Sequence, residues 1–184
     1  MKYTYSKSNT NLELLEIIEL QRQNLPQNLS SEEKKLEGFV TVEHSFEALK
    51  KMNEIAQHVL IKNNNKVVGY LLAMTKKSQH DIAILKPMFK VFDNIFYKNK
   101  IVNTYNYLVV GQVCIAKEHR GKSLLNVCYN TYKNFYCKKY DFAITEIAIS
   151  NKRSINAHKK IGFKEIHKYT DTNNTSWSVV IWDW

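Results

Sequence analysis

The chain has 184 residues, of which 44% are hydrophobic, and its formal net charge is +10. This length and apolar content suffice for one compact domain with its own core. The longest apolar runs are strand-sized, which excludes a membrane span, and the N-terminus lacks a hydrophobic signal region, so we expect a cytoplasmic protein.

Charge and cysteine placement narrow the expected partners. The lysines are scattered as pairs rather than gathered in a stripe, so charge alone does not favour nucleic acid, although a basic nucleic-acid-binding domain stays as an alternative. Cys114, Cys128 and Cys137 show no metal-like clustering. We therefore expect reduced thiols and no metal site. A reactive role for Cys114 is the less favoured alternative.

The first part of the chain is typical of a strand followed by a helix. Residues 1–7 form the expected strand. Thr10 and Glu13 form a capping box for a helix that runs to about Leu25. Ser30 begins a further short turn.

A second helix is predicted over 46–55, with Ser45 as its cap. A hairpin then joins 59–62 to 66–74 around an asparagine-rich turn. The front half therefore has the order strand, two helices, hairpin.

Residues 78–104 form a separate feature. Pro87 can begin a helix, and the apolar residues from Met88 to Phe96 give it a broad apolar face. The favoured interpretation is a helix packed on the core. The alternative is a lid or a homodimer contact that shapes an acceptor pocket.

The segment after this region pairs a strand with a basic turn. Residues 107–115 indicate a buried strand, and from Ser123 the apolar residues follow a helical period. The turn between them contains Arg120, Gly121 and Lys122. A helix N-terminus carries unpaired N–H groups and partial positive charge, which suits an anion. The alternative is an ordinary capped helix with solvated basic side chains.

A second strand–helix unit follows. Residues 142–149 read as a strand, and Ser150 or Asn151 can cap the following helix, which Gly162 ends. A final hairpin is predicted from 163–169 and 176–184.

At these two units the chain resembles the GNAT superfamily of acyl-coenzyme A-dependent N-acetyltransferases. The family's phosphate signature, Gln/Arg-x-x-Gly-x-Gly/Ala, corresponds to 120–125, where Ser123 and Leu125 replace the two small residues. The later family pattern, Asn-x-x-Ala/Ser-x-x-x-Tyr-x-x-x-Gly-Phe, corresponds without gaps to Asn151, Ser154, His158, Gly162 and Phe163. His158 stands where the family usually has tyrosine.

The resemblance implies one α/β (α+β) domain over 1–184. Its sheet would be mixed, mostly antiparallel and twisted, with about six or seven strands flanked by helices and with splayed fourth and fifth strands. Residues 78–104 would be a helical insertion between the third and fourth strands.

The activity implied by the resemblance is transfer of an acetyl group from acetyl-coenzyme A to a primary amine of a small molecule or a peptide. The amine would attack directly in a ternary complex, without a covalent acyl-enzyme. The alternative is a degenerate GNAT-like domain that binds acyl-coenzyme A but does not turn it over.

The resemblance also implies the donor contacts. Backbone at Val113, Cys114 and Ile115 would pair with the pantetheine arm, and one N–H there would polarise the thioester carbonyl. The remaining implied contacts to the donor are Arg120, Gly121, Lys122, Ser123, Leu124, Asn151, Ser154 and Lys159. A solvated side chain is the alternative for Lys159.

Catalytic roles are implied for two residues. His158 would be the acid that protonates the leaving sulfur, and the alternative is a hydrogen bond to the sulfur or a water. Glu146, on the fifth strand, is a candidate base. Glu43 and His44 would line the acceptor side. For Glu146, Glu43 and His44 the alternative is an ordinary polar residue.

Overall fold

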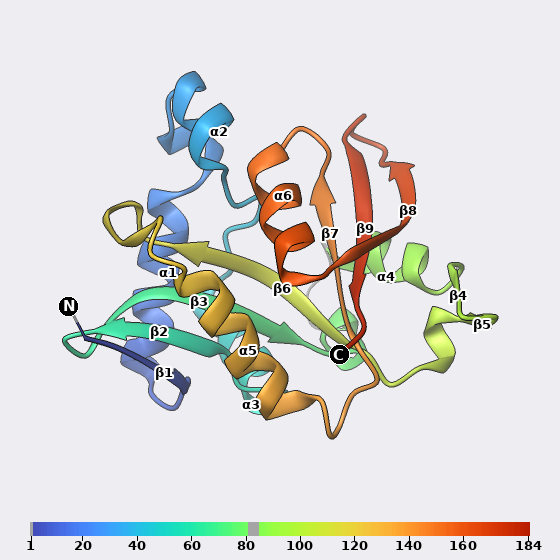
Figure 1. The fold of residues 1–184 in the computed structure, drawn as a ribbon, viewed down its shortest axis with the longest axis horizontal. Coiled ribbons are helices and arrows are strands. Elements are labelled where there is room, and N and C mark those ends of the chain that lie inside the picture. Colours follow the sequence, from blue (N-terminus) through green and yellow to red (C-terminus); the bar gives the residue numbers. More distant parts are fainter. Residues whose placement is uncertain (1, 81–84) are drawn as a thin grey trace.

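The computed structural model describes residues 2–80 and 85–184 and contains a seven-stranded sheet (Figure 1). Its strands are β1 (Tyr3–Lys7), β2 (Val59–Asn63), β3 (Lys66–Met74), β6 (Leu108–Ile115), β7 (Ala143–Ala148), β8 (Lys164–Thr170) and β9 (Ser176–Trp182). Their order is β1-β2-β3-β6-β7-β9-β8, with β6 and β7 parallel and the other neighbours antiparallel. The predicted mixed, mostly antiparallel sheet is confirmed.

Helices cover both faces of this sheet. Figure 1 shows α5 (Leu124–Tyr136) and α6 (Lys152–Ile161) in front of it, and α1 (Asn11–Gln23) and α3 (Phe46–Ile55) behind it. The short helix α2 (Ser31–Glu37) lies beside α6. None of the helices in the described ranges has the length and apolar character that crossing a membrane requires.

Local sequence signals explain the helix starts. Thr10 and Glu13 form the expected capping box at α1, in which Thr10 Oγ1 accepts from the Glu13 N–H and the Glu13 carboxylate accepts from the Thr10 N–H. Ser30 and Glu33 form a second capping box at α2, and Ser45 caps α3. These caps satisfy N–H groups that the first helical turn leaves without a partner.

The described part of 78–104 packs on the core as predicted, but its helix is shorter than expected. Pro87 lies in the first turn of α4 (Lys86–Phe92), and Phe89 and Phe92 are buried. The chain then turns into the small hairpin of β4 (Phe96–Tyr97) and β5 (Lys100–Ile101). Phe96 is 69% exposed, so the apolar face does not extend to it. Residues 81–84 of this predicted insertion lie outside the described residues.

The predicted splaying of the fourth and fifth main strands is confirmed at β6 and β7. These strands pair only through Leu108 with Ala143 and Val109 with Ile144. The pairing of β3 with β6 shifts register at Gly111, where a Cβ would lie 2.8 Å from Met74 Cε, so a larger residue would require the Met74 side chain to move. A bulge bends the strand that carries it. The edge of β6 beyond Val110 therefore faces a gap instead of a neighbouring strand.

Candidate active site

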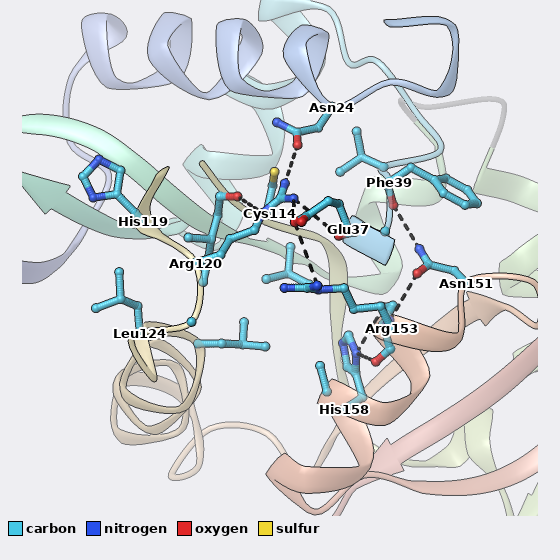
Figure 2. Close-up of a pocket in the computed structure, with 18 of the residues that line it drawn as sticks. Asn24, Glu37, Phe39, Cys114, His119, Arg120, Leu124, Asn151, Arg153 and His158 are labelled. Atoms are coloured by element: carbon cyan, nitrogen blue, oxygen red, sulfur yellow. Dashed lines mark hydrogen bonds and ion pairs between the residues drawn. The ribbon is translucent and has the colours of Figure 1, made fainter. Parts of the chain in front are cut away.

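A cleft opens where β6 and β7 separate. Its larger part is a cavity of about 220 Å³, and an adjoining smaller part has about 60 Å³. Both parts are lined by Phe39, Val40, Val113, Asn151, Ser154 and His158. The larger part also reaches the turn before α5 (Figure 2), and the smaller part reaches Glu146 on β7. These shared walls make the two parts one cleft with two ends.

The turn before α5 presents backbone groups to the larger cavity. Gly121 has φ +75° and Ser123 has φ +56°, so both adopt the left-handed conformation that builds anion-binding nests. A Cβ at Gly121 would meet no atom within 4 Å, so the space beside this backbone is open. Because the first N–H groups of a helix have no intrahelical partner, this turn can receive a phosphate through its backbone.

The basic side chains of this turn already contact other parts of the protein. Arg120 donates from Nη2 to Asn24 Oδ1 at 2.6 Å and from Nη1 to Glu37 Oε2 at 2.7 Å (Figure 2). Lys122 Nζ donates to the carbonyl oxygen of Glu118 at 3.0 Å and does not line the cavity. The phosphate-binding capacity of the turn therefore rests first on its backbone.

Asn151 resolves the alternative caps of α6. Its Oδ1 accepts from the Ser154 N–H at 3.1 Å, so Asn151 is the N-cap. Its Nδ2 donates to the Phe39 carbonyl oxygen at 3.1 Å. Asn151 thus joins α6 to the chain segment before α3, and both segments form walls of the cleft.

Cys114 lines the larger cavity, but its thiol is not poised as a nucleophile. The side chain is buried, and burial raises the pKa of its thiol to about 12, against a smaller opposing effect of Arg120. The thiolate is the reactive form of cysteine. Cys114 therefore acts as a wall of the cleft. All three cysteines are free.

Glu146 lies in the smaller part of the cleft with the properties of a general base. Burial raises the pKa of its carboxyl to about 7, against the lowering effect of a hydrogen bond from Tyr169. The Tyr169 hydroxyl donates to Glu146 Oε2 at 2.6 Å. A base is most effective when its pKa lies near the working pH. Glu146 can therefore exchange a proton at neutral pH.

His158 lines both parts of the cleft, but its ring nitrogens are bonded within the protein. Nδ1 lies 2.8 Å from the Ser154 carbonyl oxygen, so it must be the donor there. Nε2 lies 2.7 Å from the Tyr129 hydroxyl and accepts from it. Burial lowers the pKa of the imidazole to about 4. A neutral ring with both nitrogens engaged disfavours the acid role that the resemblance implies, and we propose instead a positioning role, in which His158 links the Tyr129 hydroxyl to the Ser154 carbonyl oxygen.

A double-mutant cycle tests this positioning role. H158F leaves the buried Tyr129 hydroxyl without its acceptor, and Y129F leaves Nε2 without its donor. Each single change should lower the free energy of unfolding by about 1–3 kcal/mol. The double variant should cost less than the sum, because both polar groups leave together. An H158F protein with unchanged stability and a kcat reduced by about 100-fold or more would restore the acid role.

Other predicted site residues lie away from the cleft. Glu43 pairs with Arg22 at 2.9 Å on the surface. His44 is buried against α1, where Gln21 contacts both its ring and its backbone N–H. Glu43 and His44, which were predicted to line the acceptor side, therefore line neither part of the cleft. Lys159 is exposed and lines neither part of the cleft.

The segment before α3 does reach the cleft, but through other residues than the two predicted. Phe39, Val40 and Thr41 line the cleft in place of Glu43 and His44. Irregular backbone explains the error, because alternation gives no guide to side-chain direction outside a strand. The other lining residues that the sequence reasoning missed are Asn24, Glu37, Gly38, Val110, Gly111, Gln112, His119, Leu125, Thr145, Ile147, Ala148, Arg153, Ala157 and Trp177.

Known protein structures share this architecture. No family model matches the sequence, and no curated protein matches it. Solved structures do match. An acetyltransferase of the GNAT family from Streptococcus agalactiae superposes with a TM-score of 0.68 at 12% identity, covering 99% of this chain and 95% of that one.

Two further structures carry ligands. The NatC complex bound to Gag peptide and CoA matches with a TM-score of 0.68 at 11% identity, covering 100% of this chain and 99% of that one. Arabidopsis thaliana NAA60 in complex with acetyl-CoA matches with a TM-score of 0.65 at 9% identity over 100% of both chains. The chain therefore has the fold of the GNAT N-acetyltransferases.

Proposed function

We propose that this single domain is an N-acetyltransferase that moves an acetyl group from acetyl-coenzyme A to a primary amine. The observation that carries the proposal is the cleft itself. It joins an open backbone nest at Gly121 and Ser123 to a carboxyl with a pKa of about 7 at Glu146. An anion-binding end and a proton-accepting end in one cleft fit a phosphorylated donor and an amine acceptor.

Different parts of the cleft contact different parts of the donor. The nest holds the diphosphate, and the open edge of β6 from Gly111 to Ile115 pairs with the pantetheine arm, so that a backbone N–H at Val113 or Cys114 polarises the thioester carbonyl. Asn151 supports the cleft by holding its two walls together.

Glu146 prepares the nucleophile. It accepts one proton of the ammonium group, directly or through a water, and the neutral amine then attacks the thioester carbon. The C–S bond breaks, and the leaving thiolate takes up the amine's second proton. A thiol has an ordinary pKa near 8.5, so this thiolate needs little help from a strong acid. The unreactive thiol of Cys114 favours direct attack over an acyl-enzyme.

A thiol-release assay over two panels of amines tests the proposal. One panel holds small amines, and the other holds peptides with free N-termini or lysine side chains. We expect release of coenzyme A with an equal amount of acetylated product for at least one amine. Saturable binding of acetyl-coenzyme A with no release across both panels would instead favour a binding domain without turnover.

A further inference from the structure

Helix α2 places a negative charge beside the larger part of the cleft, where the donor is proposed to bind. Glu37, at its last position, is the one carboxylate among the described residues that line this cavity. Its Oε2 lies 2.7 Å from Arg120 Nη1 and 3.9 Å from Arg153 Nη1 (Figure 2). Glu33, one turn earlier in α2, pairs with Lys117 outside the cavity. Glu37 thus lies between two guanidinium groups beside the phosphate-binding turn.

Arg120 is held firmly in this arrangement. Besides its bonds to Glu37 and Asn24, its Nε donates to the Ile115 carbonyl oxygen at 2.8 Å. Its side chain is only 16% exposed, and that of Glu37 is 28% exposed. The hydrogen bond from Arg120 lowers the pKa of Glu37, so this carboxylate stays charged at neutral pH. The charge of Arg120 is therefore balanced by the protein itself.

A donor diphosphate that enters the nest meets both kinds of charge. The guanidinium groups attract it, and the carboxylate between them repels it. In a partly buried site these interactions are stronger than in water. We propose that Glu37 sets the affinity for the donor by competing with its phosphates for Arg120 and Arg153. This inference rests on the proposed function, because it assigns Glu37 a role in the donor site.

The substitution Glu37→Gln removes the charge of this side chain and keeps its shape. A glutamine oxygen can still accept the hydrogen bond from Arg120, while the negative charge is gone. The variant should bind coenzyme A about tenfold more tightly than the wild type at low salt. The gain should shrink as salt rises, because salt screens charges at a partly exposed site.

Calorimetric titration of three ligands tests the proposal. Coenzyme A and inorganic pyrophosphate carry the diphosphate charge, whereas acetyl-pantetheine has no phosphate. E37Q should bind coenzyme A and pyrophosphate more tightly than the wild type does. Its affinity for acetyl-pantetheine should be unchanged. E33Q serves as the matched control, because it removes a charge from the same helix outside the cavity, and it should change none of the three. Thermal melting checks that both variants are folded.

The outcomes separate this inference from the proposed function. If the wild type binds coenzyme A but E37Q binds it no more tightly, the inference fails and the proposed function stands. If neither protein binds coenzyme A, the proposed function fails, and tighter pyrophosphate binding by E37Q would still support competition by Glu37. Weaker binding of coenzyme A by a folded E37Q would overturn the inference, because Glu37 would then orient Arg120 for the donor.

Discussion

Glu146→Gln is expected to lower kcat by roughly 100- to 10,000-fold, the range for loss of a positioned general base. Glutamine can still accept the hydrogen bond from Tyr169 but cannot take a proton at neutral pH. The affinity for acetyl-coenzyme A should stay unchanged, because the nest at Gly121 belongs to the other end of the cleft. Steady-state kinetics together with calorimetric titration measure the two quantities separately.

The pH profile gives this prediction a second readout. With a pKa of about 7, Glu146 is protonated and inactive as a base at low pH, so kcat/KM of the wild type should rise with pH through about 7. The residual rate of E146Q should lack this step. E165Q is a matched control, because Glu165 on β8 accepts a hydrogen bond from the Ser178 hydroxyl and lies outside the cleft. A wild-type profile that is flat between pH 5 and 9 would contradict the assignment of the base.

The same substitution has a predicted effect on stability. The folded state raises the pKa of Glu146 from 4.5 to about 7, so it binds the proton more tightly than the unfolded chain does. This contribution to stability is fully present below the unfolded pKa and is lost as pH rises through the folded value. E146Q has no titrating group at this position, so it does not lose this stability as pH rises. Its melting temperature relative to the wild type should therefore increase as pH is raised from 4.5 to 7.

Gly121→Asp is expected to weaken binding of coenzyme A by about 100-fold or more, because it places a carboxylate in the open space of the nest. A pair of unit charges about 5 Å apart costs roughly 1–3 kcal/mol at intermediate dielectric, and a diphosphate carries more than one charge. Asp also tolerates a positive φ, so the backbone strain is small. Calorimetric titration at low salt measures the loss.

Gly121→Asn is the matched variant for this experiment. Asparagine has nearly the same shape as aspartate and the same tolerance for the left-handed conformation, but it carries no charge. Its affinity should fall by no more than about tenfold, from the space that it fills. Unchanged affinity in both variants would place the phosphates away from this turn. Melting temperatures of both proteins show whether the turn itself has been disturbed.

Much of the fold was predictable because local signals agreed with one another. The capping box at Thr10, the cap at Ser45 and the helix stop at Gly162 each mark a boundary that the structure contains. The apolar runs of the sequence then predicted the central strands of the sheet. The hairpin at Phe96 and Ile101 could not be predicted in this way, because its strands have only two residues each and bury no continuous face.

The site was predictable only where it depends on backbone position. The left-handed turn at Gly121 follows from the strand–turn–helix order and a glycine. The partners of Arg120 could not be predicted, because Asn24 and Glu37 are far from it in the sequence and only tertiary packing brings them together. Nor does sequence reveal the Tyr129 hydroxyl that donates to His158 Nε2, or the burial that lowers the pKa of this imidazole.

Titration of acetyl-coenzyme A into the wild-type protein tests the central claim most directly. A donor site built on the nest before α5 predicts saturable binding to one site per chain, an affinity that falls as salt rises, and a higher melting temperature in the presence of the ligand. Absence of saturable heat up to roughly 1 mM acetyl-coenzyme A, with an unchanged melting temperature, would contradict it.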